Sequence, residues 1–246
     1  MQAVIAPTYG SPDVLEVREV PIPVPGEGEV LIKVHAASLN AFDWHVLRAD
    51  PFFVRLSFGL RRPKIKALGA DVAGVIDEVG PSVAGFEVGD EVLGELGSCG
   101  LGACAEFVSA PVCVLTHKPA EISFAQAAAL PMAGVTALQA LRDEANVKPG
   151  ERVLIHGGSG GVGGFAIQIA KVLGAQVTAV GSAGKMAQMS ELGADEVIDY
   201  TSTDAFADGR MWDVILGVNG FQPLRTYRAA LNPGGRYLMI GGTGKQ

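Results

Sequence analysis

ERVLIHGGSGGVGGFAIQIAKVLGAQVTAVGSAGKMAQMSELGADEVIDY, residues 151–200, is the stretch that decides the fold. It opens with a short apolar run at 153–156, which is typical of a buried parallel strand. A glycine-dense turn follows at 157–164, and apolar residues then recur at helical spacing over 165–173. Residues 176–180 are typical of a second strand. Strand, glycine turn, helix and strand within about thirty residues predict the βαβ unit of a dinucleotide-binding fold.

The glycine turn contains the pattern G-x-G-x-x-G at Gly158, Gly160 and Gly163. Such glycines allow a tight turn, close approach of the backbone to a pyrophosphate, and close packing of helix on strand. We expect the pyrophosphate at the N-terminus of a helix beginning near Phe165, where free N–H groups and the helix dipole attract anions. The alternative is a loop whose glycines only permit a sharp turn. The candidate pyrophosphate-binding residues are Ser159, Gly160, Gly161 and Val162.

The end of the second strand bears on which dinucleotide binds. Folds that prefer NAD place an Asp or Glu there, and this acid hydrogen-bonds the ribose 2′-hydroxyl. Residues 180–184 contain no acid, whereas Ser182 offers a hydroxyl and Lys185 a cation, which suit a 2′-phosphate. Tyr200, at the end of the next expected strand, adds a phenol. We therefore predict NADPH as the cofactor. The alternative is that Lys185 is a solvated residue at the start of a helix.

Composition narrows the class of protein. The chain has 246 residues, 48% of them hydrophobic, and a net charge of −7. An acidic chain with few basic clusters argues against nucleic acid or an anionic membrane as the main partner. Three cysteines without a disulfide framework, and no basic and apolar leader, predict a cytoplasmic protein. Residues 122–141 lack charges but contain glutamine, proline and glycine, so we expect buried helix and turn, not a membrane span.

The first half of the chain differs from the second. Short strands with turn signals between them predict a compact β barrel or sandwich. The expected strands are residues 1–6, 15–20, 29–37, 69–79, 91–93 and 105–109. Residues 41–48 fit a short helix. The following stretch, 50–66, mixes aromatic with basic residues and is either a loop that covers a substrate or a surface loop with an apolar underside.

Three stretches of the first half, with the glycine turn, resemble one family. They are GEVLIKVHAASLNAFDWHVLR, LGADVAGVIDEVGPSVAGFEVGDEVLG and GACAEFVSAPVCVLTHKPAEISFAQAAALPMAGVTALQAL. The chain resembles the medium-chain dehydrogenase/reductase superfamily, and within it the zinc-free quinone oxidoreductase, or zeta-crystallin-like, branch. The resemblance implies an α/β chain, with a GroES-like β barrel at residues 1–122 as the substrate domain. A doubly wound Rossmann domain would follow at 123–246.

The resemblance also bears on zinc. Zinc-dependent members use a Cys, a His from a Gly-His-Glu segment, and a second Cys or Asp. Here Asn40 stands near the position of the first Cys, and Leu68-Gly69-Ala70-Asp71 replaces the Gly-His-Glu segment. No soft ligand set remains for a catalytic zinc. We therefore predict a zinc-independent site and no metal.

Without zinc, other groups must orient the substrate. By resemblance, Asn40 lines the cleft beside the nicotinamide, and His45 falls where related quinone reductases often carry a tyrosine. Either side chain can hydrogen-bond a carbonyl or quinone oxygen, and an imidazole can also protonate a developing enolate near neutral pH. The alternative for His45 is a histidine on a helix surface. Thr136 matches a family threonine that approaches the cofactor, and its alternative is a packed helix residue.

The doubly wound pattern continues after residue 200. Residues 212–216 and 236–240 are expected strands, with a helix at 224–231 that the NPGG turn at 232–235 would end. Ligands of open α/β sheets lie at the carboxyl ends of the strands. By resemblance, Asn219 and Gly242 therefore lie near the cofactor ribose or nicotinamide.

By resemblance, relatives continue with a further strand that pairs at the sheet edge and often makes a dimer, whereas the sequence given ends at Gln246, so we expect either a fragment or a shortened natural form. A homodimer is compatible with the resemblance, but its usual edge strand is missing. We expect an NADPH-dependent reductase of a quinone or an α,β-unsaturated carbonyl. The alternatives are an alcohol dehydrogenase-like or enoyl-thioester reductase of the same fold, and a non-catalytic module that binds NADPH or RNA.

Overall fold

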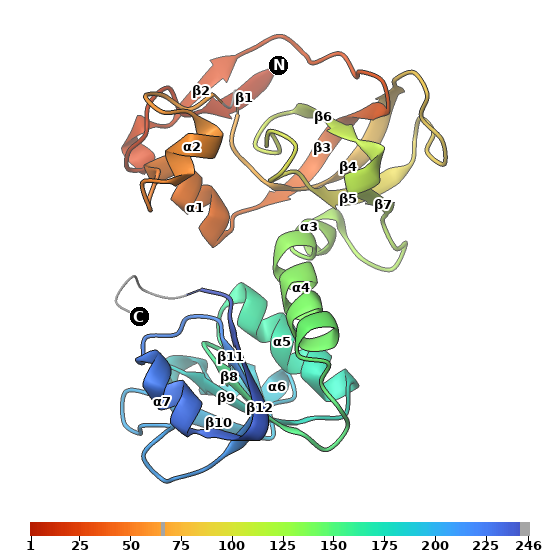
Figure 1. Ribbon diagram of the computed structural model, residues 1–246. Coiled ribbons are helices and arrows are strands. Elements are labelled where there is room, and N and C mark those ends of the chain that lie inside the picture. Colours follow the sequence, from red (N-terminus) through yellow and green to blue (C-terminus); the bar gives the residue numbers. More distant parts are fainter. Residues whose placement is uncertain (65–66, 242–246) are drawn as a thin grey trace. The chain divides into compact units, whose positions relative to one another are not determined.

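The computed structural model describes residues 1–64 and 67–241 (Figure 1). The chain forms two compact units, Met1–Met132 and Ala133–Gln246. Each unit has its own sheet and its own apolar core, so each is described by itself. Among the described residues, no helix combines the length and the apolar character needed to cross a bilayer.

The first unit is an antiparallel β domain, as predicted. Its five-stranded sheet has the order β6-β3-β4-β5-β7, and β1 pairs with β2 in a separate two-stranded sheet. Antiparallel neighbours need only short connections, which fits the turn signals of this half of the sequence. The strands are β1 (Gln2–Ile5), β2 (Glu16–Glu19), β3 (Glu29–Ser38), β4 (Asp71–Val79), β5 (Glu91–Glu95), β6 (Phe107–Pro111) and β7 (Leu115–His117).

Alternating side chains build the core of this unit. Val30 and Ile32 of β3 are fully buried and pack with Val72 and Ile76 of β4. Successive side chains of a strand point to opposite faces, so the residue between Val30 and Ile32 serves the other side of the sheet. Burying one such apolar side chain stabilises the fold by about 1.5–3 kcal/mol. The regular spacing of β-branched residues is therefore what forms this sheet.

Short helical segments connect the strands of the first unit, and among them α3 packs against β3 and β4. The predicted helix at 41–48 is confirmed, whereas a further short helix lies in a stretch predicted as a loop. That helix follows Pro51, whose carbonyl accepts a hydrogen bond from the Val54 N–H, and it ends at Gly59, which has φ +118°. The segments are η1 (Pro12–Val14), α1 (Ala41–Arg48), α2 (Val54–Phe58), η2 (Val112–Val114) and α3 (Phe124–Ala128).

The second unit contains a five-stranded parallel sheet with the order β10-β9-β8-β11-β12. This order, which starts in the middle and winds outward in both directions, is the doubly wound arrangement. The fold class predicted for this half of the chain is thereby confirmed. The strands are β8 (Arg152–His156), β9 (Gln176–Gly181), β10 (Glu196–Asp199), β11 (Trp212–Gly217) and β12 (Leu231–Met239).

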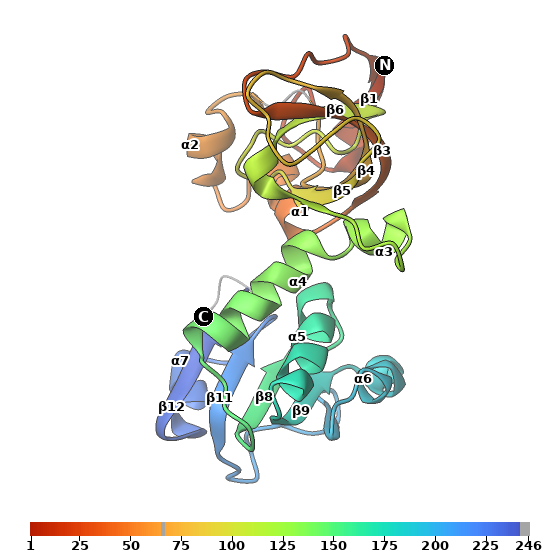
Figure 2. The ribbon, with the colours of Figure 1, turned by 90° about the vertical axis from the view of Figure 1, so that its right-hand side faces the viewer.

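Helices pack on both faces of the parallel sheet. Val153 and Ile155 of β8 are buried with residues of α5, whereas Leu154 between them is buried with Tyr227 of α7. Helices α5 and α6 lie together on one side of the sheet (Figure 2). The helical segments are α4 (Pro131–Leu138), the π-helical η3 (Gln139–Glu144), α5 (Gly161–Val172), η4 (Ala183–Lys185), α6 (Met186–Glu191) and α7 (Leu224–Ala229).

Two sequence predictions about this unit were wrong. Helix α5 begins at Gly161, not near Phe165, because the glycine run itself forms the first helical turn. The NPGG segment does not separate a helix from a strand. Helix α7 ends at Ala229, and residues 231–239 form one strand that contains an irregularity, since its register against β11 shifts between Trp212 and Val214. Gly234, with φ +79°, lies within this irregularity and adopts a conformation that suits glycine.

Candidate functional site

The glycine turn joins the carboxyl end of β8 to the first turn of α5. Gly157 has φ +103°, and its N–H and that of Gly158 both donate to the carbonyl of Val180 on the neighbouring strand. Gly160 is the N-cap of α5 and has extended backbone angles, φ −84° and ψ 177°. The turn is thus held to the sheet at its start and opens into a helix at its end.

The glycines of the turn have different steric requirements. A Cβ on Gly163 would overlap the carbonyl oxygen of Gly157 and lie 2.7 Å from the Cα of Gly158. A Cβ on Gly158 would lie 2.9 Å from the Cβ of Ala179. A Cβ on Gly160 would meet nothing closer than 3.8 Å. Gly158 and Gly163 therefore serve packing, whereas the chain itself leaves space at Gly160 for a bound group.

Unpaired backbone N–H groups flank Gly160 along the chain. Within the described part of the chain, the N–H groups of Ser159, Gly161 and Val162 have no hydrogen-bond partner. The first N–H groups of an α-helix have no partner inside the helix and carry the positive end of its dipole. Three unpaired donors beside a glycine that leaves room for an incoming group form a cradle suited to a pyrophosphate.

The carboxyl ends of β9 and β10 bring three further candidates together. Ser182 follows β9 and is half-buried, and Lys185 ends the short helix η4 and is exposed. Tyr200 follows β10, and its N–H donates to the carbonyl of Gly181 at 3.1 Å. Its ring is 49% exposed and packs edge-to-face on Phe221. In the part of the chain that the structure describes, Lys185 makes no ion pair.

Asp199 is a charged neighbour that sequence reasoning missed. It is the half-buried last residue of β10, and hydrogen bonds, chiefly from Thr201 and also from Ala183, hold the pKa of its carboxyl below the usual value. Ala183 begins η4, so the carboxylate lies beside the segment that carries Lys185. This acid comes from the strand adjacent to β9, so the residues that follow β9 in the sequence do not reveal it. A cation and a carboxylate therefore both border the place where the ribose would bind.

Asn219 lies beside the same turn, and Thr136 lies on the helix next to it. Asn219 donates its N–H to the carbonyl of His156, and a Cβ on Gly157 would lie 2.8 Å from the Asn219 nitrogen. Thr136 lies on α4 and is half-buried. Ala133, one helical turn earlier, lies 3.6 Å from where a Cβ on Gly161 would be. Gly242 lies outside the described residues.

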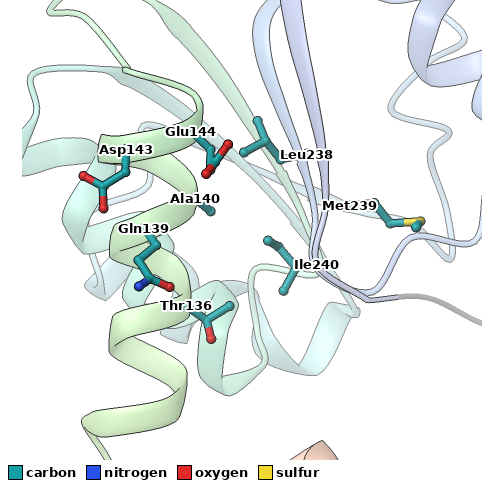
Figure 3. Close-up of a pocket in the computed structure, with 8 residues that line it drawn as sticks. All are labelled: Thr136, Gln139, Ala140, Asp143, Glu144, Leu238, Met239 and Ile240. Carbon is teal, nitrogen blue, oxygen red and sulfur yellow. The ribbon is translucent and has the colours of Figure 1, made fainter. Parts of the chain in front are cut away.

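Thr136 also lines a cavity. The cavity has a volume of about 520 Å³, within the range of small-molecule sites. In Figure 3 Thr136 projects from the helix and Ile240 from the strand end that faces it. The lining residues are Thr136, Gln139, Ala140, Asp143, Glu144, Leu238, Met239 and Ile240.

His156, the last residue of β8, is 2% exposed. Its Nδ1 lies 2.8 Å from the hydroxyl of Tyr227, and its ring packs edge-to-face on Phe206 and Phe221. Burial among these rings lowers the pKa of His156 to about 4, which the charge of Asp204 opposes only weakly. The imidazole is therefore neutral at physiological pH, and the backbone carbonyl of His156 accepts from the N–H groups of Val218 and Asn219.

In the first unit, Asn40 is held by two buried carboxylates. Its backbone N–H donates to Asp43 Oδ2 at 2.8 Å, which forms the N-terminal cap of α1. Its side-chain nitrogen donates to Asp71 Oδ2 at 2.9 Å and to Ser38 Oγ at 3.0 Å. Burial raises the pKa of both Asp43 and Asp71, and the hydrogen bonds that they accept oppose this rise. Sequence reasoning noted Asp71 only as part of a replaced zinc segment.

His45 lies one turn further along α1 and is half-buried. Its Nδ1 lies 2.5 Å from the carbonyl oxygen of Asp50, and its ring meets Trp44 edge-to-face at 4.5 Å. A carbonyl oxygen only accepts hydrogen bonds, so Nδ1 carries the proton. In the neutral ring, Nε2 therefore has a lone pair and no hydrogen.

The residues present do not fit a zinc ion. Across residues 1–64 and 67–241, no three His, Cys, Asp or Glu side chains gather in a group that could hold a metal. Asn40, where zinc-dependent relatives would have a Cys, uses its side chain in the hydrogen bonds to Ser38 and Asp71. Cys104 is half-buried, and burial raises the pKa of its thiol, which disfavours the thiolate that zinc needs.

Comparison with known proteins shows where this arrangement occurs. The alcohol dehydrogenase GroES-like domain matches residues 26–138, and the family described as zinc-binding dehydrogenase matches residues 161–246. The chain is 38% identical over 237 residues to the chloroplast envelope quinone oxidoreductase homolog of Arabidopsis thaliana, with 92% of this chain and 70% of that protein covered. It is 42% identical over 202 residues to the 2-methylene-furan-3-one reductase of Solanum lycopersicum, with 78% of this chain and 50% of that protein covered.

A solved structure agrees with these relatives. The quinone oxidoreductase from Coxiella burnetii is similar to this chain with a TM-score of 0.87 and 36% sequence identity, over 96% of this chain and 74% of that one. The antiparallel first unit, the doubly wound second unit and the glycine turn are thus found together in related proteins. The chain belongs to the medium-chain dehydrogenase/reductase superfamily, in its quinone oxidoreductase branch.

Proposed function

We propose that the protein is an NADPH-dependent reductase of quinones or α,β-unsaturated carbonyl compounds that works without zinc. The observation that carries this proposal is the cradle of unpaired N–H groups at the glycine turn, with Lys185 and Tyr200 at the neighbouring strand ends. The names of the relatives, a quinone oxidoreductase and a furanone reductase, support the substrate class.

Bound NADPH would supply a hydride from C4 of its nicotinamide. The N–H groups of Ser159, Gly161 and Val162 would hold the pyrophosphate, because they are unpaired donors at the positive end of α5. Ser182, Lys185 and Tyr200 would hold the 2′-phosphate through two hydroxyl groups and one charge. Asn219 and Thr136 would line the ribose and nicotinamide. The carboxylate of Asp199 would oppose the 2′-phosphate, so cofactor preference depends on the balance between Lys185 and Asp199.

Reduction of an enone needs a proton as well as a hydride. Hydride addition at the β-carbon leaves an enolate, and the proton completes the saturated ketone. In our proposal His45 donates this proton. Because its Nδ1–H is engaged with the Asp50 carbonyl, the donor must be an Nε2–H, which exists on that ring only in the imidazolium form.

A turnover panel tests the proposal. The purified chain is supplied with NADPH and, in parallel, with naphthoquinone, methyl vinyl ketone, an aldehyde and an enoyl thioester, and NADPH oxidation is followed by absorbance. The proposal expects turnover of the quinone or the enone, with at least about tenfold lower kcat for His45→Gln on the enone. The proposal would be contradicted if only the aldehyde or the thioester were turned over. It would also be contradicted if none of the four compounds led to oxidation of NADPH.

A further inference from the structure

Asp71 forms the centre of a buried hydrogen-bond network. It is the first residue of β4, it is 0% exposed, and it lies directly opposite Ser38 in the β3–β4 pair. Its Oδ2 accepts from Ser38 Oγ at 2.8 Å, and its Oδ1 accepts from the Met132 N–H at 3.1 Å. Met132 is in the first turn of α4, where the backbone N–H groups have no helical partner. Each of these groups donates, so they match an ionised carboxylate, which accepts only.

The chemistry of this network determines the orientation of the Asn40 amide. The amide atom that faces Asp71 must be the nitrogen, because a carboxylate cannot donate. Ser38 spends its single hydroxyl proton on Asp71, so toward Asn40 its oxygen can only accept. The amide nitrogen has two hydrogens, and these two acceptors use both of them.

We propose that Asp71, acting with Ser38, is a positioning residue that fixes Asn40 so that it presents only its carbonyl oxygen to a ligand. This inference rests on the proposed function in one respect, namely that Asn40 lines the substrate site. In the capping box the Asn40 side chain also faces the N–H of Asp43. A carbonyl oxygen has two lone pairs, so one remains for a ligand.

The consequence concerns the kind of group that Asn40 recognises. It accepts a hydrogen bond from a hydroxyl or an amide N–H, and it does not donate one to a carbonyl or quinone oxygen. Of the two forms of a quinone substrate, the hydroquinone carries such hydroxyl groups and the quinone does not. Asn40 therefore favours the reduced form, and the donor to a carbonyl oxygen in this unit must come from another side chain.

Amide hydrogen exchange tests the positioning directly, without any need for activity. NMR spectra of the ¹⁵N-labelled chain would follow the side-chain NH₂ of Asn40, assigned by its absence in Asn40→Ala. Asn146 is the internal control, since its side chain is exposed and bonded to Lys148 only through its oxygen. We expect both Asn40 hydrogens to exchange at least about tenfold more slowly than those of Asn146.

Two variants show whether slow exchange of the Asn40 amide hydrogens comes from their hydrogen bonds or only from burial of the side chain. Asp71→Asn keeps the shape of the side chain but brings an NH₂ group toward the donors, and Ser38→Ala removes one acceptor and leaves the buried charge in place. We expect each variant to accelerate exchange of at least one Asn40 hydrogen. The positioning is refuted if Asn40 exchanges as fast as Asn146, or if Ser38→Ala, in a chain with an unchanged amide spectrum elsewhere, leaves its exchange unaltered.

Ligand binding tests whether Asn40 accepts a hydrogen bond from a hydroquinone and gives none to a quinone. The dissociation constants of naphthoquinone and its hydroquinone are measured anaerobically for the unmodified chain and for Asn40→Ala. We expect Asn40→Ala to weaken hydroquinone binding about fivefold, the equivalent of one hydrogen bond, and quinone binding by less than about twofold. Equal weakening of both would show that Asn40 donates, against the inference. If neither probe binds to the unmodified chain, the proposed function fails, and the exchange experiment alone decides whether Asp71 positions Asn40.

Discussion

At the scale of single residues, glycines of one motif have separate tasks. Gly163 is required by the fold, because a side chain there would overlap the Gly157 carbonyl. Gly160 is not, because a methyl group would fit the empty turn. The pattern G-x-G-x-x-G alone does not reveal this division, since all three positions look alike in the sequence.

The two glycines therefore give a matched pair of variants. Gly163→Ala should lower the free energy of unfolding by about 2–4 kcal/mol, because the turn must move to relieve the overlap. Gly160→Ala should change it by less than about 1 kcal/mol but weaken NADPH binding at least about tenfold, since the methyl group occupies the space of the pyrophosphate. Urea unfolding and NADPH titration measure the two effects. Equal losses of stability for both variants would contradict this assignment.

His156 makes stability depend on pH. Its pKa is about 4 in the folded chain against an ordinary value of 6.5, so the unfolded chain binds the proton more readily. Above about pH 6.5 the ring is neutral in both states, and its contribution is constant. Between about pH 6.5 and 4 the free energy of unfolding should fall by about 3 kcal/mol in total as the pH falls.

Unfolding by urea at a series of pH values tests this effect. His156→Phe keeps an aromatic ring beside Phe206 and Phe221 but cannot titrate. As the pH falls from about 6.5 to about 4, the unmodified chain should therefore lose unfolding free energy relative to the variant, whose residue 156 does not titrate. A difference that stays constant over this range would show that His156 is not buried in its neutral form.

At the scale of elements, the start of α1 depends on one buried carboxylate. Asp43 is 6% exposed and accepts from the Asn40 N–H at 2.8 Å and the Ala70 N–H at 3.2 Å. It thereby caps its own helix and ties the helix to the chain before β4. The bond to Ala70 joins residues 27 positions apart, so no local sequence pattern predicts it.

Removing the Asp43 carboxylate should destabilise both the start of α1 and the hydrogen bond that joins α1 to Ala70. Asp43→Ala leaves two N–H groups without acceptors and should lower the free energy of unfolding by about 2–3 kcal/mol. Asp13→Ala is the matched control, because its carboxylate is exposed and accepts from Ser11 at the surface, and should cost less than about 0.5 kcal/mol. Similar values for the two variants would refute the capping role.

The same scale shows what the sequence could and could not predict. Strands β8, β9 and β11 were predicted because each is a continuous apolar run buried on both faces. The start of α5 was misplaced because a glycine run has no apolar periodicity, although it forms a helical turn. The interaction of Asp71 with Asn40 depends on the register of β3 against β4, which no local pattern specifies.

At the scale of the whole molecule, the chain combines an antiparallel unit that carries Asn40 and His45 with a doubly wound unit that carries the glycine turn. Relatives of this chain are named quinone oxidoreductase and 2-methylene-furan-3-one reductase. The central claim about this chain is that its second unit binds NADPH through the glycine turn and Lys185. The negative charge of Asp199 would oppose a 2′-phosphate, so the affinities for NADPH and NADH must be compared directly.

The most direct test is a fluorescence titration of the purified chain with NADPH and with NADH, repeated for Lys185→Ala and for Lys148→Ala. Lys148 is an exposed lysine just before β8, whereas Lys185 follows β9. Tighter binding of NADPH, weakened roughly tenfold toward the NADH value by Lys185→Ala and unaffected by Lys148→Ala, is the predicted result. Equal affinity for both dinucleotides that neither variant changes would contradict the assignment of the 2′-phosphate site.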